Sequence, residues 1–489
     1  MQQFKHYING QFEEGSEHFE SLNPASGLPW AIFPAATEAD VNRAVEAADA
    51  ALFHGEWAEM NATQRGKLLR KLGDLISEHA AELGELETND SGKLAKETRS
   101  QTGYVADYYL YYAGLADKIQ GDVIPIDKPN MHVFTTREPI GVVAAIVPWN
   151  AQMFLAATKI APALAAGNTL VVKASEQAPA TMLKFAELIH EAGFPAGVVN
   201  IITGFGEPCG RALTSHPKVA RVAFTGSPET ARHIIKNTSN NFAHVSLELG
   251  GKSPLIIFDD ANLEGAVNGI IAGNYGASGQ SCVAGSRVFI QSGIYDQLLA
   301  KIKERAAQIV IGNPLDDATQ VGPLATIAQL ERAERIIANS VAQGAELVYG
   351  GKRPSHLNAG WYFEPTLLAC PNQSIDAVQT EFFAPVISAM RFETEAEVIA
   401  MANDTEFGLA AGVFTENLAR AHRVTKKIRA GIIYVNTYRV ISPIAPFGGF
   451  KQSGGSREAG IDAIHDYTRT KTTWINTSDT PMANPFVMR

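Results

Sequence analysis

The sequence predicts an α/β protein in which parallel sheets are built from strands connected by helices. Short apolar runs alternate with amphipathic stretches along most of the chain, as expected for repeated strand–helix–strand units. The 489 residues correspond to about three structural units at roughly 150 residues per domain. Apolar residues make up 46% of the chain, a fraction typical of a globular protein.

Charge and cysteine content narrow the class of protein. The formal net charge of −10 argues against a nucleic-acid partner, which requires a basic face. The three cysteines, Cys209, Cys282 and Cys370, are too few for a disulfide framework and fit a reducing compartment. Residues 1–20 are polar and acidic and lack the apolar core of a signal peptide. We therefore expect a cytoplasmic protein.

The first half of the chain contains the first alternating unit. One helix is expected after Thr37, its N-cap, and a second from Thr63 to beyond Leu83, because apolar residues recur there at helical spacing. A third helix, at about 180–192, is followed by Gly193, a residue that favours helix ends. The expected strands are 141–147, 168–173, 198–204 and 221–226.

The segment from Pro139 to Thr158 has no charged residue and is long enough to suggest a membrane span. Pro148, Trp149 and Asn150 interrupt it, and a membrane helix tolerates such residues poorly. We interpret it as a strand buried on both faces that enters a turn, and we expect no membrane association.

A second alternating unit starts near Leu247. The strand-like segments in it are 253–260, 286–291, 346–351 and 431–436, with helices at about 294–310, 326–343, 394–403 and 416–429. Residues 122–140, with their prolines, suit a hairpin on a protruding edge, and the tail after Tyr467 suits another strand. These two segments are expected to pair with each other or with a second subunit.

Three residue types point to nucleophilic chemistry. Cys282 has small neighbours on both sides, so the backbone can approach a substrate closely, although a free cysteine is more often a buried apolar residue. Glu248 precedes a Gly-Gly turn and is a candidate general base, or simply a solvated carboxylate. Asn150 follows strand 141–147, where a side-chain amide can stabilise an oxyanion or cap a turn.

Two strand ends suggest a nucleotide cofactor. Phe224 to Ser227 close a strand and open a helix, which is a favourable place for a pyrophosphate, although the turn does not match a dinucleotide fingerprint. Lys173 ends strand 168–173, and Glu176 follows it. A lysine there can hold ribose hydroxyls, and the carboxylate accepts hydrogen bonds from them and repels a 2′-phosphate.

Taken together, the motifs resemble the aldehyde dehydrogenase superfamily over essentially the whole chain. The segments that carry the resemblance are PWN at 148–150, KASE at 173–176, FTGS at 224–227, ELGGK at 248–252, GQSCVAG at 279–285, EFFAPV at 381–386, NDTEFGLAAGVFT at 403–415 and APFGGFKQSGGSRE at 445–458. The chain departs from the family pattern at Ala231, Ala384 and Ser456, where glycine is usual. None of these departures involves Cys282, Glu248 or Asn150.

The resemblance implies a Rossmann-like parallel-sheet cofactor domain, an α/β catalytic domain and a small β oligomerisation arm. The implied segments are 1–121 and 141–247 for the NAD-binding domain, 248–440 for the catalytic domain, 122–140 and 468–489 for the arm, and 441–467 for a return to the cofactor domain. By family analogy the arm makes the protein a homodimer or homotetramer.

The resemblance also implies the chemistry. Cys282 matches the family nucleophile, Asn150 the oxyanion donor and Glu248 the base that activates water, while Lys159 and Glu458 match a proton relay. The implied cofactor is NAD, with NADP possible, and no metal is implied. The residues that match cofactor contacts are Ile146, Trp149, Lys173, Glu176, Gly206, Gly210, Phe224, Gly226, Ser227, Leu249, Gly250, Glu381 and Phe383.

The substrate implied by the resemblance is a small-molecule aldehyde. The positions that match the family's substrate tunnel are Ala151, Leu155, Thr158, Ser281, Val283, Arg439, Ile441 and Phe447. Several of these side chains are small, which favours a bulky or aromatic aldehyde, and Arg439 is a candidate for binding a carboxylate or for a surface ion pair. Two alternatives stay open: acyl transfer to coenzyme A, which the presence of Glu248 disfavours, and a non-catalytic binding protein, which the intact candidate residues disfavour.

Overall fold

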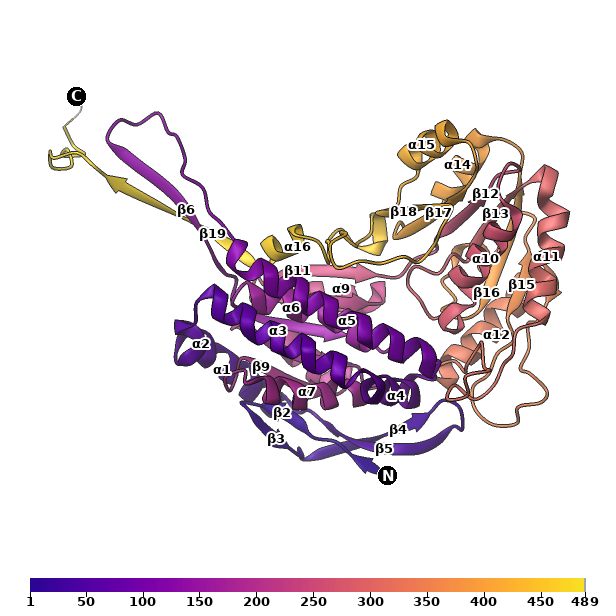
Figure 1. The fold of residues 1–489 in the computed structure, drawn as a ribbon, viewed down its shortest axis with the longest axis horizontal. Coiled ribbons are helices and arrows are strands. Elements are labelled where there is room, and N and C mark those ends of the chain that lie inside the picture. The colour runs from indigo at the N-terminus through magenta and orange to yellow at the C-terminus, as the bar shows by residue number, and fades with distance from the viewer. Residues whose placement is uncertain (488–489) are drawn as a thin grey trace.

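The computed structural model describes residues 1–487 and contains two large sheets with helices on both faces, plus a protruding two-stranded arm (Figure 1). The first sheet has the order β11-β10-β7-β8-β9-β2-β3. Its strands are β2 (His6–Ile8), β3 (Gln11–Glu13), β7 (Val142–Val147), β8 (Thr169–Ala174), β9 (Val199–Thr203), β10 (Val219–Gly226) and β11 (His244–Leu249). From β11 to β9 the strands are parallel, as the alternation predicts.

Helices cover both faces of the first sheet because its strands are apolar on both sides. On one face Val143, Ala145 and Val147 pack against helices that include α6 and α7, and on the other Val142 and Ala144 pack against α1. The helices of this half are α1 (Glu38–Phe53), α2 (Glu56–Glu59), α3 (Ala62–Glu78), α4 (Ala80–Ser91), α5 (Ala95–Leu115), α6 (Gln152–Ala165), α7 (Ala180–Ala192), α8 (Arg211–Ser215) and α9 (Pro228–Thr238).

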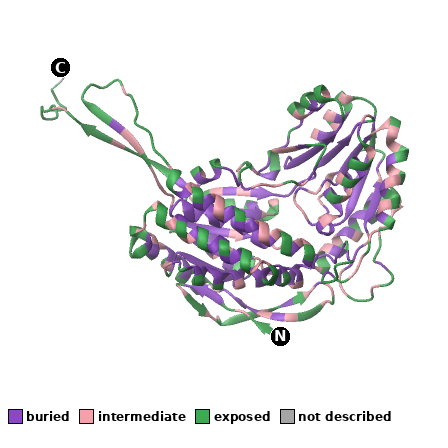
Figure 2. Cartoon of the chain, viewed as in Figure 1, coloured by how far each residue is buried: buried purple, intermediate pink, exposed green. Residues whose placement is uncertain are grey.

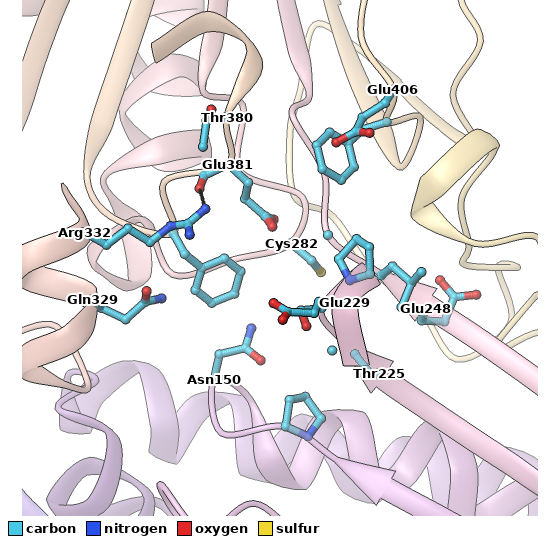
Figure 3. Close-up of a pocket in the computed structure, with 18 of the residues that line it drawn as sticks. Asn150, Thr225, Glu229, Glu248, Cys282, Gln329, Arg332, Thr380, Glu381 and Glu406 are labelled. Atoms are coloured by element: carbon cyan, nitrogen blue, oxygen red, sulfur yellow. Dashed lines mark hydrogen bonds between the residues drawn. The ribbon is translucent and has the colours of Figure 1, made fainter. Parts of the chain in front are cut away.

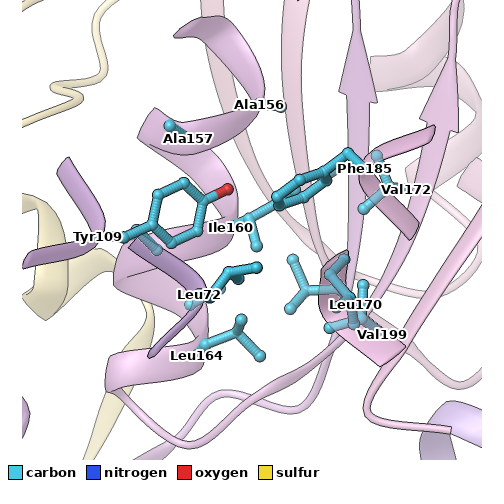
Figure 4. Close-up of a cluster of buried hydrophobic side chains, with 14 of the residues drawn as sticks. Leu72, Tyr109, Ala156, Ala157, Ile160, Leu164, Leu170, Val172, Phe185 and Val199 are labelled. Carbon is cyan, nitrogen blue, oxygen red and sulfur yellow. The ribbon is translucent and has the colours of Figure 1, made fainter. Parts of the chain in front are cut away.

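Figure 4 shows part of the core between the first sheet and its helices. Leu72 of α3 and Ile160 and Leu164 of α6 meet Leu170 of β8 in a layer that also includes Phe185 of α7. Removing such side chains from water stabilises the fold by roughly 1.5–3 kcal/mol each. This dry layer fixes α6, and with it the loop 148–151, against the carboxyl end of β7.

Local signals predict the helix ends well. Thr37 caps α1 with a capping box, since its side chain accepts from the backbone of Asp40 while the Asp40 carboxylate accepts from Thr37. Gly193 ends α7 in a left-handed conformation. The helix predicted from Thr63 to beyond Leu83 is instead two helices, α3 and α4, because the chain leaves the helical path at His79.

The second sheet has the order β14-β15-β16-β13-β12-β17-β18, and only β14 is antiparallel to its neighbour. Its strands are β12 (Pro254–Ile257), β13 (Arg287–Gln291), β14 (Glu346–Tyr349), β15 (Thr366–Ala369), β16 (Val386–Phe392), β17 (Ala410–Phe414) and β18 (Ile432–Val435). Its helices are α10 (Leu263–Asn274), α11 (Tyr295–Ala307), α12 (Ile327–Ala342), α13 (Asp376–Gln379), α14 (Glu395–Asn403) and α15 (Leu418–Lys427).

Two features of the sheets differ from the sequence prediction. β15, β16 and β17 lie inside the second sheet although none was predicted as a strand. In addition, the second unit was predicted to begin at residue 248, whereas β11 carries Glu248 and Leu249 as part of the first sheet, paired with Thr225 and Gly226 of β10. The base candidate therefore belongs to the first sheet.

The arm consists of β6 (Met131–Pro139) and β19 (Thr468–Asn476), which pair antiparallel along their whole length. The short helix α16 (Asp462–Asp466) precedes β19. Figure 2 shows that most of the arm is exposed, in contrast to the sheets. A small sheet of β1 (Gln2–Gln3), β5 (Leu28–Ala35) and β4 (Glu17–Asn23) lies near the N-terminus.

Candidate active site

Cys282 lies between α10 and β13, after a short turn at Gly276–Gly279, and forms part of the wall of two cavities. The turn requires glycine at 279, which has φ +72°, because a Cβ there would lie 2.2 Å from the carbonyl carbon of Ala384. The cavities have volumes of about 570 and 690 Å³. The thiol is thus accessible from two directions, as a nucleophile between a cofactor and a substrate must be.

Asn150 is the other residue of the predicted catalytic set that lines both cavities. It follows β7 in the first sheet, and its Nδ2 donates to the carbonyl of Gln280 at 3.2 Å. An amide nitrogen carries two N–H groups, so one remains for a substrate oxygen. Figure 3 shows the side chains of Asn150 and Cys282 in the 570 Å³ cavity, where Asn150 comes from the first sheet's half and Cys282 from the second's.

Glu248 lies in the wall of the 570 Å³ cavity and is only 3% exposed. Neither of its carboxylate oxygens has a hydrogen-bond partner among the described residues. Burial and the nearby negative charge of Glu458 raise the pKa of Glu248 well above its usual range, although Lys159 and Arg457 oppose the shift. A buried carboxyl with a raised pKa and no partner is suited to accept a proton from water.

Lys159 and Glu458 form a buried ion pair beside this carboxyl. The Nζ of Lys159 also donates to the hydroxyl of Thr225 at 2.6 Å. Thr158, predicted to contact substrate, donates instead to Glu458 Oε2 at 2.7 Å and does not line the cavity walls formed by Ala151 and Leu155. Its side chain is 2% exposed, so it satisfies its hydroxyl within the buried network.

A third cavity of about 500 Å³ continues from the 570 Å³ cavity along the carboxyl edge of the first sheet, where the two share walls at Pro148, Trp149 and the turn 225–227. The predicted cofactor residues that line it are Ile146, Trp149, Lys173, Glu176, Gly206, Gly210, Phe224, Gly226 and Ser227. In open α/β sheets ligands bind at this edge. The two cavities together form an elongated space suited to a dinucleotide.

The polar groups of the third cavity fit one end of such a ligand and its phosphates. Lys173 Nζ lies 3.3 Å from the carboxylate of Glu176, which places both at the end of β8. Ser227 caps α9 and accepts from the backbone of Thr230, so the helix N-terminus opens into the cavity and favours a negative group. At Gly206 an added Cβ would meet no atom within 4 Å, which leaves open space over the backbone.

Glu381 and Phe383 lie at the other end of the elongated space. The Glu381 carboxylate accepts from the backbone N–H of Gly251 at 3.0 Å, and burial raises its pKa to about 7. Gly250 lies close beside it, and a Cβ there would push the Glu381 carboxylate out of its present position. The Phe383 ring packs edge-on against Trp149 at 5.4 Å. These residues, with Leu249, line the cavity wall next to Cys282.

The 690 Å³ cavity contains the other predicted substrate residues: Ala151, Leu155, Ser281, Val283, Arg439, Ile441 and Phe447. The sequence prediction missed a polar wall contributed by α5 and the turn before it, with Lys93, Lys96, Glu97, Gln101 and Tyr104. It also missed Gln329 and Arg332 of α12, which line the 570 Å³ cavity. Isolated polar residues on amphipathic helices carry no sequence signal that separates a cavity wall from a solvated surface.

The chain is similar to known proteins over nearly its whole length. The family model described as "Aldehyde dehydrogenase family" matches residues 12–473. A (Z)-2-((N-methylformamido)methylene)-5-hydroxybutyrolactone dehydrogenase from Acinetobacter baylyi is 56% identical, with both chains covered completely. A betaine aldehyde dehydrogenase from Rhizobium leguminosarum is 42% identical over 96% of both chains.

Solved structures have the same fold. A betaine aldehyde dehydrogenase from Staphylococcus aureus in complex with NAD⁺ superimposes with a TM-score of 0.97 at 39% identity, covering 99% of this chain and 96% of that one. An NAD⁺ complex of an aldehyde dehydrogenase from Bacillus cereus gives 0.95 at 40% identity, with 97% of each chain covered.

Within residues 1–487, no helix has the length and apolarity needed to span a bilayer.

The fold and the family model confirm the resemblance seen in the motifs. The chain belongs to the aldehyde dehydrogenase family, whose members are oxidoreductases acting on aldehydes.

Proposed function

We propose that the protein oxidises an aldehyde to a carboxylic acid with NAD⁺ through a thioester on Cys282. The observation that carries the proposal is the position of Cys282 and Asn150, which alone of the cavity residues line both the 570 and the 690 Å³ spaces. An aldehyde in the larger space meets the thiol from one side. A cofactor in the smaller space lies on the other side.

The first step is addition of the Cys282 thiolate to the aldehyde carbon, which forms a C–S bond and places the electron pair on oxygen. The free N–H of Asn150 and the backbone N–H of Cys282 are the donors for this alkoxide. Removing one such donor typically costs about 3 kcal/mol in other oxyanion holes. NAD⁺, when bound, accepts the hydride that leaves the same carbon, and a thioester remains on Cys282.

The second step is hydrolysis of the thioester. Glu248 takes a proton from water, the water oxygen adds to the acyl carbon, and the C–S bond breaks to return the thiolate. Glu248 is suited to this because its carboxylate has no partner in the described chain and lies in the cavity wall beside Cys282. The ion pair of Lys159 and Glu458 next to it offers a route for the proton.

The cofactor assignment is supported by the fit of the elongated space and by the NAD⁺ named for the Bacillus cereus and Staphylococcus aureus structures. Lys173 and Glu176 are the candidates for the adenosine ribose, and Glu381 with Phe383 for the second ribose. Leu249 and Gly250 approach the same region. The carboxylate of Glu176 favours NAD⁺ over NADP⁺, because it repels a 2′-phosphate.

Replacing Glu176 by Ser is expected to improve the KM for NADP⁺ by about tenfold, equivalent to about 1.4 kcal/mol, while the KM for NAD⁺ rises. The measurement is initial rate against each cofactor at a fixed aldehyde concentration. The matched control is Glu191→Ser, an exposed glutamate on α7 that lies outside the cavities described above. An unchanged ratio of the two KM values in Glu176→Ser would show that this carboxylate does not determine the choice between NAD⁺ and NADP⁺.

We also propose a substrate class. The relative that is 56% identical is named for a 5-hydroxybutyrolactone, and opening such a ring gives a chain with a carboxylate at one end and an aldehyde at the other. The 690 Å³ cavity has room for a substituted chain, because Ala151 and Val283 are small wall residues. The proposed substrate is a substituted aldehyde of this kind.

The test of the reaction is NADH formation with a panel of short aliphatic, long aliphatic, aromatic and carboxylated aldehydes, using Cys282→Ala as the blank. We expect turnover that disappears in the blank, and a higher kcat/KM for bulky or carboxylated aldehydes than for acetaldehyde. Turnover only after addition of coenzyme A would support acyl transfer instead. A marked preference for acetaldehyde would contradict the proposed substrate class.

The domain roles and the assembly are also proposals. We assign cofactor binding to the first sheet, the nucleophile Cys282 to the second, and subunit pairing to the arm, and we place the protein in the cytoplasm. Trp474 and Ile475 on β19 are 59% and 44% exposed, an apolar surface that a partner subunit would cover. Light scattering should give the mass of a dimer or tetramer, and deletion of residues 468–489 should give a monomer; a monomeric intact chain would contradict the assignment.

A further inference from the structure

The 690 Å³ cavity has two unlike sides. Phe154, Leu155, Ile441 and Phe447 give one side an apolar surface, whereas α5 and the turn before it contribute polar and charged groups. Lys96 and Ser100 are exposed and mark the outer part of the cavity, while Cys282 marks its inner end. The charges along this path decide which substrates enter it.

Two of the cations in the wall already have hydrogen-bond partners within the protein. Lys93 is 5% exposed, and its Nζ lies 2.8 Å from Glu87 Oε1 and 2.7 Å from Gln101 Oε1, so its charge is neutralised. The Nζ of Lys96 donates to the backbone carbonyls of Asp317 and Thr319. Neither ammonium group is directed to a ligand in the cavity.

Arg439 differs from both lysines. Its Nη1 donates to the carbonyl of Ala272 at 2.9 Å, and among residues 1–487 no carboxylate lies within ion-pair distance of its guanidinium. The Nε and Nη2 groups make no hydrogen bond within the same part of the chain. The guanidinium is partly exposed on the cavity wall, and its free edge is available to a ligand with the planar, two-oxygen shape of a carboxylate.

The backbone holds this side chain in place. Arg439 itself has φ +63°, in the left-handed region, and Nη1 occupies the space beside Gly276, where a Cβ would lie only 2.6 Å away. The positive charge is felt at the nucleophile, since Arg439 is among the groups that lower the pKa of the Cys282 thiol. The acid in the same wall, Glu97, is not paired with Arg439: its Oε1 accepts from the backbone of Ala277 at 3.3 Å, and its Oε2 has no partner among the described residues.

We infer that Arg439 binds a carboxylate carried by the aldehyde substrate and so makes the enzyme selective for aldehyde acids over uncharged aldehydes of equal length. The inference rests on the proposed function and names the residue that sets its substrate class. The free Nε–Nη2 edge matches the two oxygens of a carboxylate.

The test compares 4-oxobutanoate with butanal, which has the same chain length and no charge. In the wild-type protein we expect a higher kcat/KM for 4-oxobutanoate. In Arg439→Gln this value should fall by about 10- to 100-fold, the range expected for a hydrogen-bonded charged contact, mainly through KM. Oxidation of butanal by this variant should stay within about twofold of the wild-type value, and Arg439→Lys should recover part of the loss. Lys303→Met, which replaces an exposed cation on α11 outside the cavities described above, should change the kcat/KM of neither substrate.

A second measurement does not depend on turnover. Succinate should bind the wild-type protein in calorimetry, compete with 4-oxobutanoate, and lose binding in Arg439→Gln. Equal losses for butanal and 4-oxobutanoate in that variant, or succinate binding that is unchanged, would overturn the role of Arg439. Failure of the wild type to oxidise either aldehyde would contradict the proposed function instead, and succinate binding would still report on Arg439.

Discussion

Replacing Cys282 by Ala is expected to reduce aldehyde-dependent NADH formation by at least about 10⁴-fold, because no covalent intermediate can form without the nucleophile. Binding of NAD⁺ should be retained, since the cavity residues proposed for the adenosine end lie on the first sheet, away from the substituted side chain. Stopped-flow absorbance should show neither a burst nor a steady rate, while fluorescence titration should show cofactor binding close to that of the wild type.

The other two cysteines of the chain serve as controls for this experiment. Cys209 and Cys370 are 0% and 4% exposed and lie in the apolar cores, so Cys209→Ala and Cys370→Ala should keep their activity. Iodoacetamide should label Cys282 first, and an aldehyde in excess should protect it. Residual turnover above about 1% in Cys282→Ala, or complete loss in either control, would mean that a residue other than Cys282 is the nucleophile.

The rate at which Cys282 is labelled should depend on pH, because it follows the protonation state of the thiol. Burial, with the negative charges of Glu381 and Glu248, raises the pKa of the Cys282 thiol to about 12, and the Val283 N–H and Arg439 act in the opposite direction. A group with a raised pKa keeps its proton to higher pH, so the thiolate fraction and the rate of labelling should rise as pH rises from 6 to 10. A rate that falls over this range would contradict the environment described for Cys282.

The sequence predicted that the candidate catalytic residues would lie at one site, and the structure places all three in the wall of one cavity. Asn150, Glu248 and Cys282 each lie at or beside the end of a short buried strand or turn, where small neighbours and abrupt polar residues interrupt an apolar pattern. Asn150 and Glu248 lie near each other because β7 and β11 both flank β10 in the parallel sheet that the alternation predicts. Cys282 comes from the second sheet, and its approach depends on how the two units pack, which no local pattern predicts. The family membership shown by the comparisons is consistent with this pattern.

Residues on helices were harder to predict, as Thr158 shows. Its spacing from Ala151 and Leu155 places all three on one helical face, which suggests a common cavity wall. The cavity does not extend along the face as far as Thr158, and a buried hydroxyl needs a partner, which Glu458 supplies from a segment 300 residues away. Such a partner is set by tertiary packing and leaves no local signal.

The inner strands of the second sheet were also hard to predict, because tertiary packing determines them. β15 and β17 are short and include small residues, so their apolar runs resemble those of buried helix segments. What makes them strands is their pairing with β16 and β12, across long loops. Local propensity alone could predict the unit but not its full set of strands.

Replacing Glu248 by Gln separates the two halves of the reaction. If Glu248 acts on water, the variant should still form one NADH per active site in a rapid burst, and the later steady rate should fall by about 10²–10⁴-fold. The substitution keeps the shape of the side chain and removes its ability to accept a proton. Rapid-mixing absorbance at several enzyme concentrations measures the burst, and its amplitude should equal the concentration of active sites.

The raised pKa of Glu248 fixes the sign of the pH effect. Burial and Glu458 keep this carboxyl protonated to higher pH than an ordinary glutamate, so its base form, and with it thioester hydrolysis, should increase with pH and then level off. The Gln variant should lose this dependence, while hydroxylamine, a nucleophile that needs no base, should restore turnover. Glu406→Gln is the matched control, because Glu406 lines the same cavity but is exposed (Figure 3). Loss of the burst itself would show that Glu248 is needed to activate Cys282 instead, since a base that acts only on water has no part in forming the first NADH.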